Sequence, residues 1–225
     1  ADTYNTAVGA DAGYYNETGT QNTIIGSRAC YGASGNSFSD TTAVGKDALK
    51  SVTTGGSNTA IGGLALYSLT SGTRSVAVGY TAGFSTTTGS PSGNVYVGHS
   101  AGYYNQTGAG NVYVGYFAGE GASGQSNAKN VGVGYQALTS ITTGAGNQAI
   151  GGGSGQNITS GEYNVLIGAD AGNVMTTTSN AIAIGRNAGD AINSTGPNGS
   201  VLIGLSAGTA ITDGSGNVAV GYQSL

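Results

Sequence analysis

The chain has 225 residues, of which 44 are glycine and only 7% are charged, and its formal net charge is -4. Six basic residues spread along the sequence offer no patch for a phosphate backbone or an anionic lipid, so we expect neither nucleic-acid binding nor membrane insertion. Cys30 is the only cysteine, which excludes an internal disulfide, and we interpret it as a small packed residue.

One motif, exemplified by Asn94-Val95-Tyr96-Val97-Gly98, recurs thirteen times along the chain. Successive motif glycines are always seventeen or nineteen residues apart, at Gly9, Gly26, Gly45, Gly62, Gly79, Gly98, Gly115, Gly134, Gly151, Gly168, Gly185, Gly204 and Gly221. A fixed period of this length is typical of a solenoid, in which each coil buries its apolar side by stacking on the next. We therefore predict one all-β domain over residues 1–225, a parallel β-solenoid of about twelve 17- or 19-residue coils.

A short strand is expected before each glycine, with side chains alternating between two faces. The residue directly before the glycine is Val or Ile in every copy, and we expect this column in the core. The residue one position earlier, often alanine but Tyr96 and Tyr113 in two copies, is then expected to point outward. Its apolar character predicts that other copies of the chain cover it. Val114→Asp should accordingly be severely destabilising, because it would bury an unpaired charge.

Three further columns predict the shape of a coil. The third residue after the glycine is alanine in eleven copies and serine in two, which predicts that two walls approach closely. The seventh is an apolar residue of the opposite wall in Val52, Leu69, Ile141, Ile158, Met175, Ile192 and Ile211. Asparagine opens nine motifs, and we interpret these residues as a hydrogen-bonded ladder of stacked amides, not as ligands.

The titratable residues predict no catalysis. Ten acidic residues and one histidine, His99, are scattered over thirteen coils without the spacing of a triad or a column of carboxylates. A calcium-binding roll would need regularly repeated aspartates, and Asp11, Asp47 and Asp170 form no adjacent ladder. We expect no enzyme activity, no cofactor and no metal site.

Tyrosines recur at two offsets from the glycine and are the candidate surface-binding row. They are Tyr14, Tyr31, Tyr67, Tyr80, Tyr103, Tyr116, Tyr135 and Tyr222. Such rings can stack on one another between coils, or they can present a surface for sugar rings or for another chain.

Two other features of the turns bear on function. Glycosylation-type sequons are candidate modification sites at Asn16, Asn105, Asn157, Asn193 and Asn198. A threonine row, which either serves turn chemistry or orders water as in ice-binding proteins, comprises Thr53, Thr70, Thr87, Thr142, Thr159, Thr177 and Thr212.

The runs Arg74-Ser75-Val76-Ala77-Val78-Gly79 and Asn180-Ala181-Ile182-Ala183-Ile184-Gly185 resemble the head repeat of YadA-like trimeric autotransporter adhesins. They are also similar to the Asn-Thr-Ala-Ile-Gly repeats of some phage tail-fibre shafts. The resemblance implies a left-handed parallel β-roll, usually trimeric, on an extracellular or virion surface, binding matrix or host-surface molecules.

We therefore expect a structural or adhesive building block of an extracellular fibre or surface appendage. The partners expected are copies of the chain itself, as a trimer or stacked end to end because no polar capping repeat ends the array. Glycans or host-surface molecules are further candidate partners. The alternatives are an ice-binding or carbohydrate-binding solenoid, or the receptor-contacting shaft of a phage tail fibre.

Overall fold

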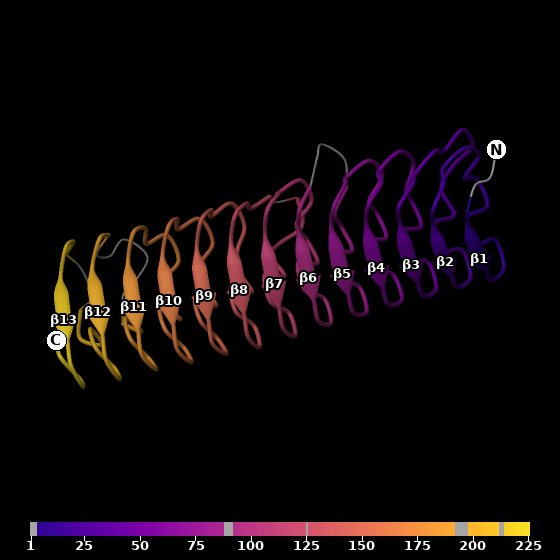
Figure 1. Cartoon of the computed structure of the whole chain (residues 1–225). Helices are drawn as coiled ribbons and strands as arrows, with labels where there is room; N and C mark the ends of the chain where they lie inside the picture. Colours follow the sequence, from indigo (N-terminus) through magenta and orange to yellow (C-terminus); the bar gives the residue numbers. More distant parts are fainter. Residues whose placement is uncertain (1–3, 88–91, 125, 192–197, 212–213) are drawn as a thin grey trace.

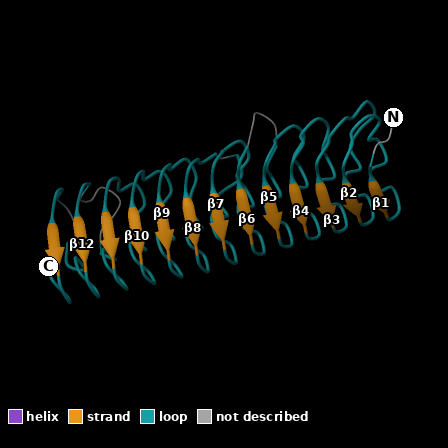
Figure 2. Ribbon diagram, in the orientation of Figure 1, coloured by secondary structure: helices purple, strands orange, loops and turns teal. Residues whose placement is uncertain are grey.

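The chain forms a parallel β-solenoid, as the repeat predicts. The computed structural model describes residues 4–87, 92–124, 126–191, 198–211 and 214–225, and this part of the chain contains thirteen strands and no helix (Figures 1 and 2). Each strand has three residues: β1 Thr6–Val8, β2 Thr23–Ile25, β3 Thr42–Val44, β4 Thr59–Ile61, β5 Val76–Val78, β6 Val95–Val97, β7 Val112–Val114, β8 Val131–Val133, β9 Gln148–Ile150, β10 Val165–Ile167, β11 Ile182–Ile184, β12 Val201–Ile203 and β13 Val218–Val220. Consequently, no helix of the described residues could cross a membrane.

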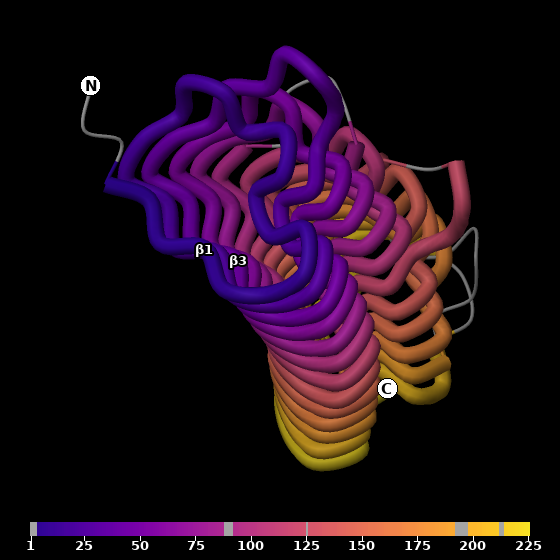
Figure 3. The backbone as a smooth tube through the Cα atoms, turned by 90° about the vertical axis from the view of Figure 1, so that its right-hand side faces the viewer, coloured from indigo at the N-terminus to yellow at the C-terminus, as the bar shows by residue number. Residues whose placement is uncertain are grey.

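All thirteen strands belong to one sheet in chain order, and each pairs with the next in parallel. The register places the same column of every coil side by side, as in Val97 opposite Val114 and Val114 opposite Val133. The chain winds anticlockwise as it recedes from the N-terminal end in Figure 3, so the solenoid is left-handed. The seventeen- and nineteen-residue coils keep this register because insertions of two residues preserve the facing of every strand.

The motif glycines form the corner that follows each strand. Gly45 has φ of 136°, and a Cβ atom there would lie 2.6 Å from the carbonyl oxygen of Gly62 in the next coil. A side chain is therefore excluded both by the backbone conformation and by the contact between coils. This steric requirement explains why the column contains only glycine.

The two faces of the sheet are the reverse of those predicted. In β3 to β12 the middle residue of each strand is buried, whereas its two neighbours are half-buried or exposed on the outer face. Val114, expected in the core, lies on the outer face, and Tyr113 is 0% exposed. The thin interior favours the column that is mostly alanine, because a continuous column of Val and Ile would not fit between the close walls. The predictions of a Val/Ile core and of an outer alanine face are therefore wrong.

In the core, large and small side chains of neighbouring columns are matched to each other. Where the fourth residue after the glycine is leucine, as in Leu49 and Leu66, the neighbouring strands present Ala43, Ala60 or Ala77 inward. Where it is glycine, a large side chain takes the space: a Cβ atom on Gly83 would lie 2.6 Å from the Tyr96 ring. A large side chain in one core column is thus accompanied by alanine or glycine in the other column, so the interior stays filled along the solenoid.

The opposite wall and the asparagine ladder are confirmed. The described members of the seventh-residue column are buried, and Ile192 lies outside the described residues. Asn130 shows the ladder bonding: its Oδ1 accepts the backbone N–H of Asn147 at 2.9 Å, and its Nδ2 donates to the Gly144 carbonyl at 2.9 Å. Asn130 and Asn147 are both 0% exposed, so the amide of Asn130 satisfies buried backbone groups and is not available to a ligand.

Candidate binding surfaces

The outer face of the sheet is a flat apolar strip. We call it the outer strip, and it consists of the first and third residues of all thirteen strands. One column is Val or Ile throughout, and the other is Thr in β1 to β4 and mostly Val thereafter. Its exposed members include Val8, Ile25, Ile61, Ile150, Ile167, Ile203, Val218 and Val220. Twelve steps of about 4.8 Å and a width of about 10 Å give it an area of roughly 600 Å², at the upper end of what a monomer exposes in one patch.

The candidate tyrosines divide into two rows on different corners of the coil. The Tyr14 row lies five residues after the glycines and contains Tyr14, Tyr31, Lys50, Tyr67, Phe84 and Tyr103. Tyr14 stacks on Tyr31 with ring centroids 5.6 Å apart, and Phe84 stacks between Tyr67 and Tyr103 at 5.0 Å from each. Lys50 joins the row by a cation–π contact, with Nζ 5.1 Å from the Tyr67 ring centroid.

The Tyr80 row lies directly after the glycines and contains Tyr80, His99, Tyr116 and Tyr135. His99 is 5.5 Å from Tyr80 and 5.2 Å from Tyr116, and Tyr116 is 5.6 Å from Tyr135 with rings parallel to within 3°. Neighbouring rings cover each other's faces, so only the two end rings, Tyr80 and Tyr135, keep one face open. Tyr222 is in the same column near the C-terminal end, and there the neighbouring coil supplies Leu205.

Sequence reasoning missed the non-tyrosine members of both rows. His99 and Phe84 have the same offset from the motif glycine as the tyrosines beside them. That shared offset was the signal that could have identified them, since parallel in-register coils stack equal offsets. The ring stacking confirms contact between coils, and a binding role for these tyrosines stays a prediction.

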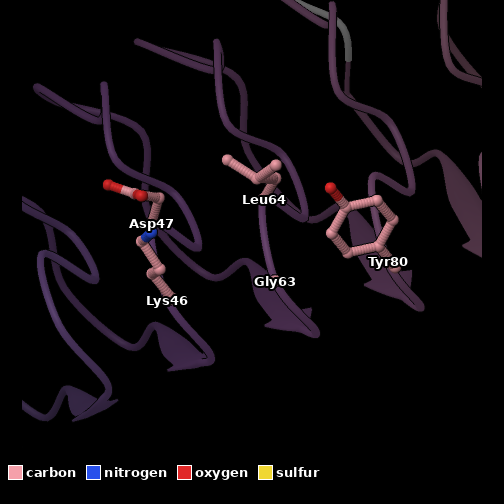
Figure 4. Close-up of a pocket in the computed structure, with 5 residues that line it drawn as sticks. All are labelled: Lys46, Asp47, Gly63, Leu64 and Tyr80. Carbon is pink, nitrogen blue, oxygen red and sulfur yellow. The ribbon is translucent and has the colours of Figure 1, made fainter.

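A slot opens at the N-terminal end of the Tyr80 row. Its volume is about 180 Å³, and it is lined by Lys46, Asp47, Gly63, Leu64 and Tyr80 (Figure 4). Lys46, Gly63 and Tyr80 occupy the same position in three successive coils, so the slot is the place where Gly63 contributes no side chain. The open face of Tyr80 borders it on one side.

A group of charges lies next to this slot. The Arg28 guanidinium donates to Asp47 Oδ2 at 2.9 Å, and Lys50 Nζ is 3.9 Å from Asp47 Oδ1. Lys50 Nζ also bonds the Tyr67 hydroxyl at 3.1 Å. Asp47 is buried and engaged with both cations, whereas Lys46 is exposed and makes no side-chain bond or ion pair with any described residue.

The sequons differ in access. Asn105 is 0% exposed, and its Nδ2 donates to the Tyr96 hydroxyl at 2.7 Å, so a glycan cannot be carried there in the folded chain. Asn157 and Asn198 are exposed, and Asn16 is half-buried. Asn193 lies outside the described residues. Glycosylation of the three accessible asparagines stays a prediction.

Part of the threonine row forms hydrogen bonds between coils. The hydroxyls of Thr53 and Thr142 donate to the carbonyl oxygens of Thr70 and Thr159, at 3.0 and 2.9 Å. Thr159 continues the pattern toward the Thr176 carbonyl at 3.1 Å. These three donors serve turn chemistry, whereas the buried Thr70 hydroxyl has no hydrogen-bond partner and Thr177 is exposed. A water-ordering role of the row stays a prediction, and Thr212 lies outside the described residues.

The described residues contain no metal-binding cluster: no group of three or more of their His, Cys, Asp or Glu side chains is placed to hold a metal ion. Burial raises the pKa of the Cys30 thiol to about 12, so this side chain is protonated and unreactive at neutral pH. Partial burial also raises the pKa of Glu120. Partial burial and the negative charge of Asp170 together raise the pKa of Asp190.

Comparison with known proteins identifies no relative of this chain. No protein-family model matches the chain, and no curated protein matches it either. The similarity to adhesin and tail-fibre repeats is therefore a prediction from the motif alone.

Proposed function

We propose that this chain is a non-catalytic structural rod that assembles side by side with copies of itself through the outer strip. It would serve as a building block of an extracellular fibre or of a cell-surface or virion appendage. The observation that carries this proposal is the strip of Val, Ile and Thr side chains, interrupted only by Gln148, whose members are exposed or half-buried along the thirteen strands. Water is a poor environment for such a surface, and burial against a second strip is favourable.

The dimensions support a specific association. Two outer strips in contact would bury roughly 1,200 Å² in total, which is the lower end of the range for stable interfaces. A flat surface with the same two columns in nearly every coil is also complementary to itself, as the interface of a two-fold dimer requires. The motif similarity to trimeric adhesins favours three copies instead of two.

The experiment is a comparison of oligomeric state by sedimentation velocity and light scattering. The double variant Ile61→Asp with Ile150→Asp places two charges on exposed positions of the outer strip, and it should convert the oligomer to a monomer. Ser71→Asp with Ser160→Asp adds the same charge at exposed turn positions and is the matched control, which should assemble like the parent. A parent that stays monomeric at high concentration, or a strip variant that assembles normally, would contradict the proposal.

Ice binding is the second candidate, and four threonines of the outer strip are the residues that support it. Thr6, Thr23, Thr42 and Thr59 are in register on the outer face of β1 to β4, beside a column of Val and Ile. Thermal hysteresis that is lost in a Thr23→Val and Thr42→Val variant would favour this function over assembly. Hysteresis that is absent from the parent would exclude it.

A further inference from the structure

The Tyr80 row ends at a glycine on each side, Gly63 and Gly152, and the slot lies over Gly63. Tyr80, His99, Tyr116 and Tyr135 fill four successive coils, and the coil before Tyr80 has Gly63 at the same position. The coil before that has Lys46. A Cβ atom on Gly63 would meet the Tyr80 ring at 3.4 and 3.6 Å, which is ordinary contact, and φ of Gly63 is not in the left-handed region. Neither backbone strain nor crowding therefore explains the glycine.

The empty place has the size of a single ring. Lys46 and Tyr80 are separated by two coil spacings, about 9.6 Å, so a ring at the level of Gly63 would lie about 4.8 Å from each. The slot volume of about 180 Å³ is smaller than the pockets that hold drug-sized ligands, and it leaves room for one ring with its substituents.

The surroundings of the slot suit a sugar ring. Tyr80 is 54% exposed, so the slot is open to water on one side, where the hydroxyl groups of a pyranose stay solvated. The C–H groups on the face of the same ring suit the electron-rich face of Tyr80. The open face of Tyr80 provides the platform, since His99 covers its other face.

The charge on the far wall favours an anion. Three of the six basic residues, Arg28, Lys46 and Lys50, lie in two adjacent coils of a chain whose net charge is -4. Asp47 also lines the slot; its Oδ2 accepts from Arg28, and its Oδ1, which has no hydrogen-bond partner, lies 3.9 Å from Lys50 Nζ. Lys46 makes no ion pair with any described residue and lies across Gly63 from Tyr80 (Figure 4), so the three cations outnumber the one carboxylate beside the slot.

We propose that the slot over Gly63 binds an acidic sugar residue, a pyranose ring with a carboxylate. The ring stacks on the open face of Tyr80 and fills the missing place in the row, and the carboxylate pairs with the Lys46 ammonium. This site lies off the outer strip, so it goes beyond the assembly function and does not depend on it. The slot is shallow and the ligand small, so the dissociation constant for one sugar unit should be about millimolar.

The experiment uses saturation-transfer difference NMR with methyl β-glucuronide and, as its neutral partner, methyl β-glucoside. The parent should transfer saturation to the ring protons of both and bind the glucuronide more tightly. Gly63→Tyr continues the stack and fills the slot, and it should abolish binding while the circular dichroism melt stays that of the parent. Gly152→Tyr is the matched control: it fills the same position at the other end of the row, where the Cβ contact of 3.9 Å also allows a side chain, and it should bind like the parent.

A second variant separates the charge from the ring contact. Lys46→Gln should weaken glucuronide binding about threefold, as expected for one exposed ion pair, and leave glucoside binding unchanged. Three results would overturn the proposal: no transfer from the parent, unchanged glucuronide binding by Gly63→Tyr, or equal effects of Lys46→Gln on both sugars. Loss of self-association in Gly63→Tyr would likewise overturn it, because the slot would then hold a side chain of a second copy.

Discussion

Tyr113 and Val114 are neighbours in β7 with opposite facings, and replacing each in turn tests how the sheet is oriented. Tyr113 is 0% exposed, stacks on Tyr96 with ring centroids 6.0 Å apart, and donates from its hydroxyl to Asn127 Oδ1 at 2.5 Å. Tyr113→Ala would leave a cavity in a thin core and unpair a buried amide. Removal of a buried aromatic side chain costs about 3 to 5 kcal/mol, so we expect a loss of about 4 kcal/mol or more.

Val114→Asp places its charge on the outer strip, where water reaches it. The variant loses cross-strand contacts with Val97 and Val133, each worth about 0.2 to 1 kcal/mol, so about 1 to 2 kcal/mol is expected. This is far from the severe effect that a buried charge would cause.

The assay is urea-induced loss of the sheet signal in circular dichroism, with dilute protein so that self-association does not contribute. Tyr113→Ala should unfold at a clearly lower urea concentration than Val114→Asp, and Val114→Thr should stay close to the parent. A Val114→Asp variant that is less stable than Tyr113→Ala would refute the assignment of the inner and outer faces.

Two other predictions concern the core. Gly172 has φ of 61°, and a Cβ atom there would lie 2.8 Å from Leu166, so Gly172→Leu should destabilise the chain. Adding Leu166→Ala should recover part of the lost stability, because the pair then has the arrangement of Leu49 and Ala60. A double-mutant cycle should give a coupling energy of about 1 to 3 kcal/mol, and a value near zero would contradict the matching of large and small core residues. Burial raises the pKa of the Cys30 thiol from 9.0 to about 12 and raises the pKa values of Tyr96 and Tyr113 above 10.0. Their contribution to stability is fully present below pH about 9 and is lost as the pH rises further, because the unfolded chain ionises first. Thermal melts should therefore be insensitive to these groups at neutral pH and fall in alkali, and Tyr96→Phe should shift the fall to higher pH.

The two tyrosine rows show how far sequence reasoning extends toward the candidate site. Equal offsets from the glycine predict that rings of neighbouring coils stack, and Tyr116 on Tyr135 does so. A search for tyrosine alone misses Phe84 and His99, which lie in the same rows. They are found only when all residues with the same offset are considered together. The slot at Gly63 depends on the absence of a side chain between two particular neighbours, which becomes visible only when the coils are placed in register.

The sequence by itself determined the parallel solenoid, its coil length, the glycine corners, the opposite apolar wall and the asparagine ladder, because each of these follows from a residue type repeated at a fixed spacing. Only the tertiary structure decided which face of the strands is inside. Alternation with period two separates two faces without identifying the inner one, and β-branched Val and Ile are equally suited to a pleated outer surface. The distance between the walls settles it: a thin coil holds alanine, or one large side chain such as Tyr113 opposite a glycine, and excludes an unbroken Val/Ile column.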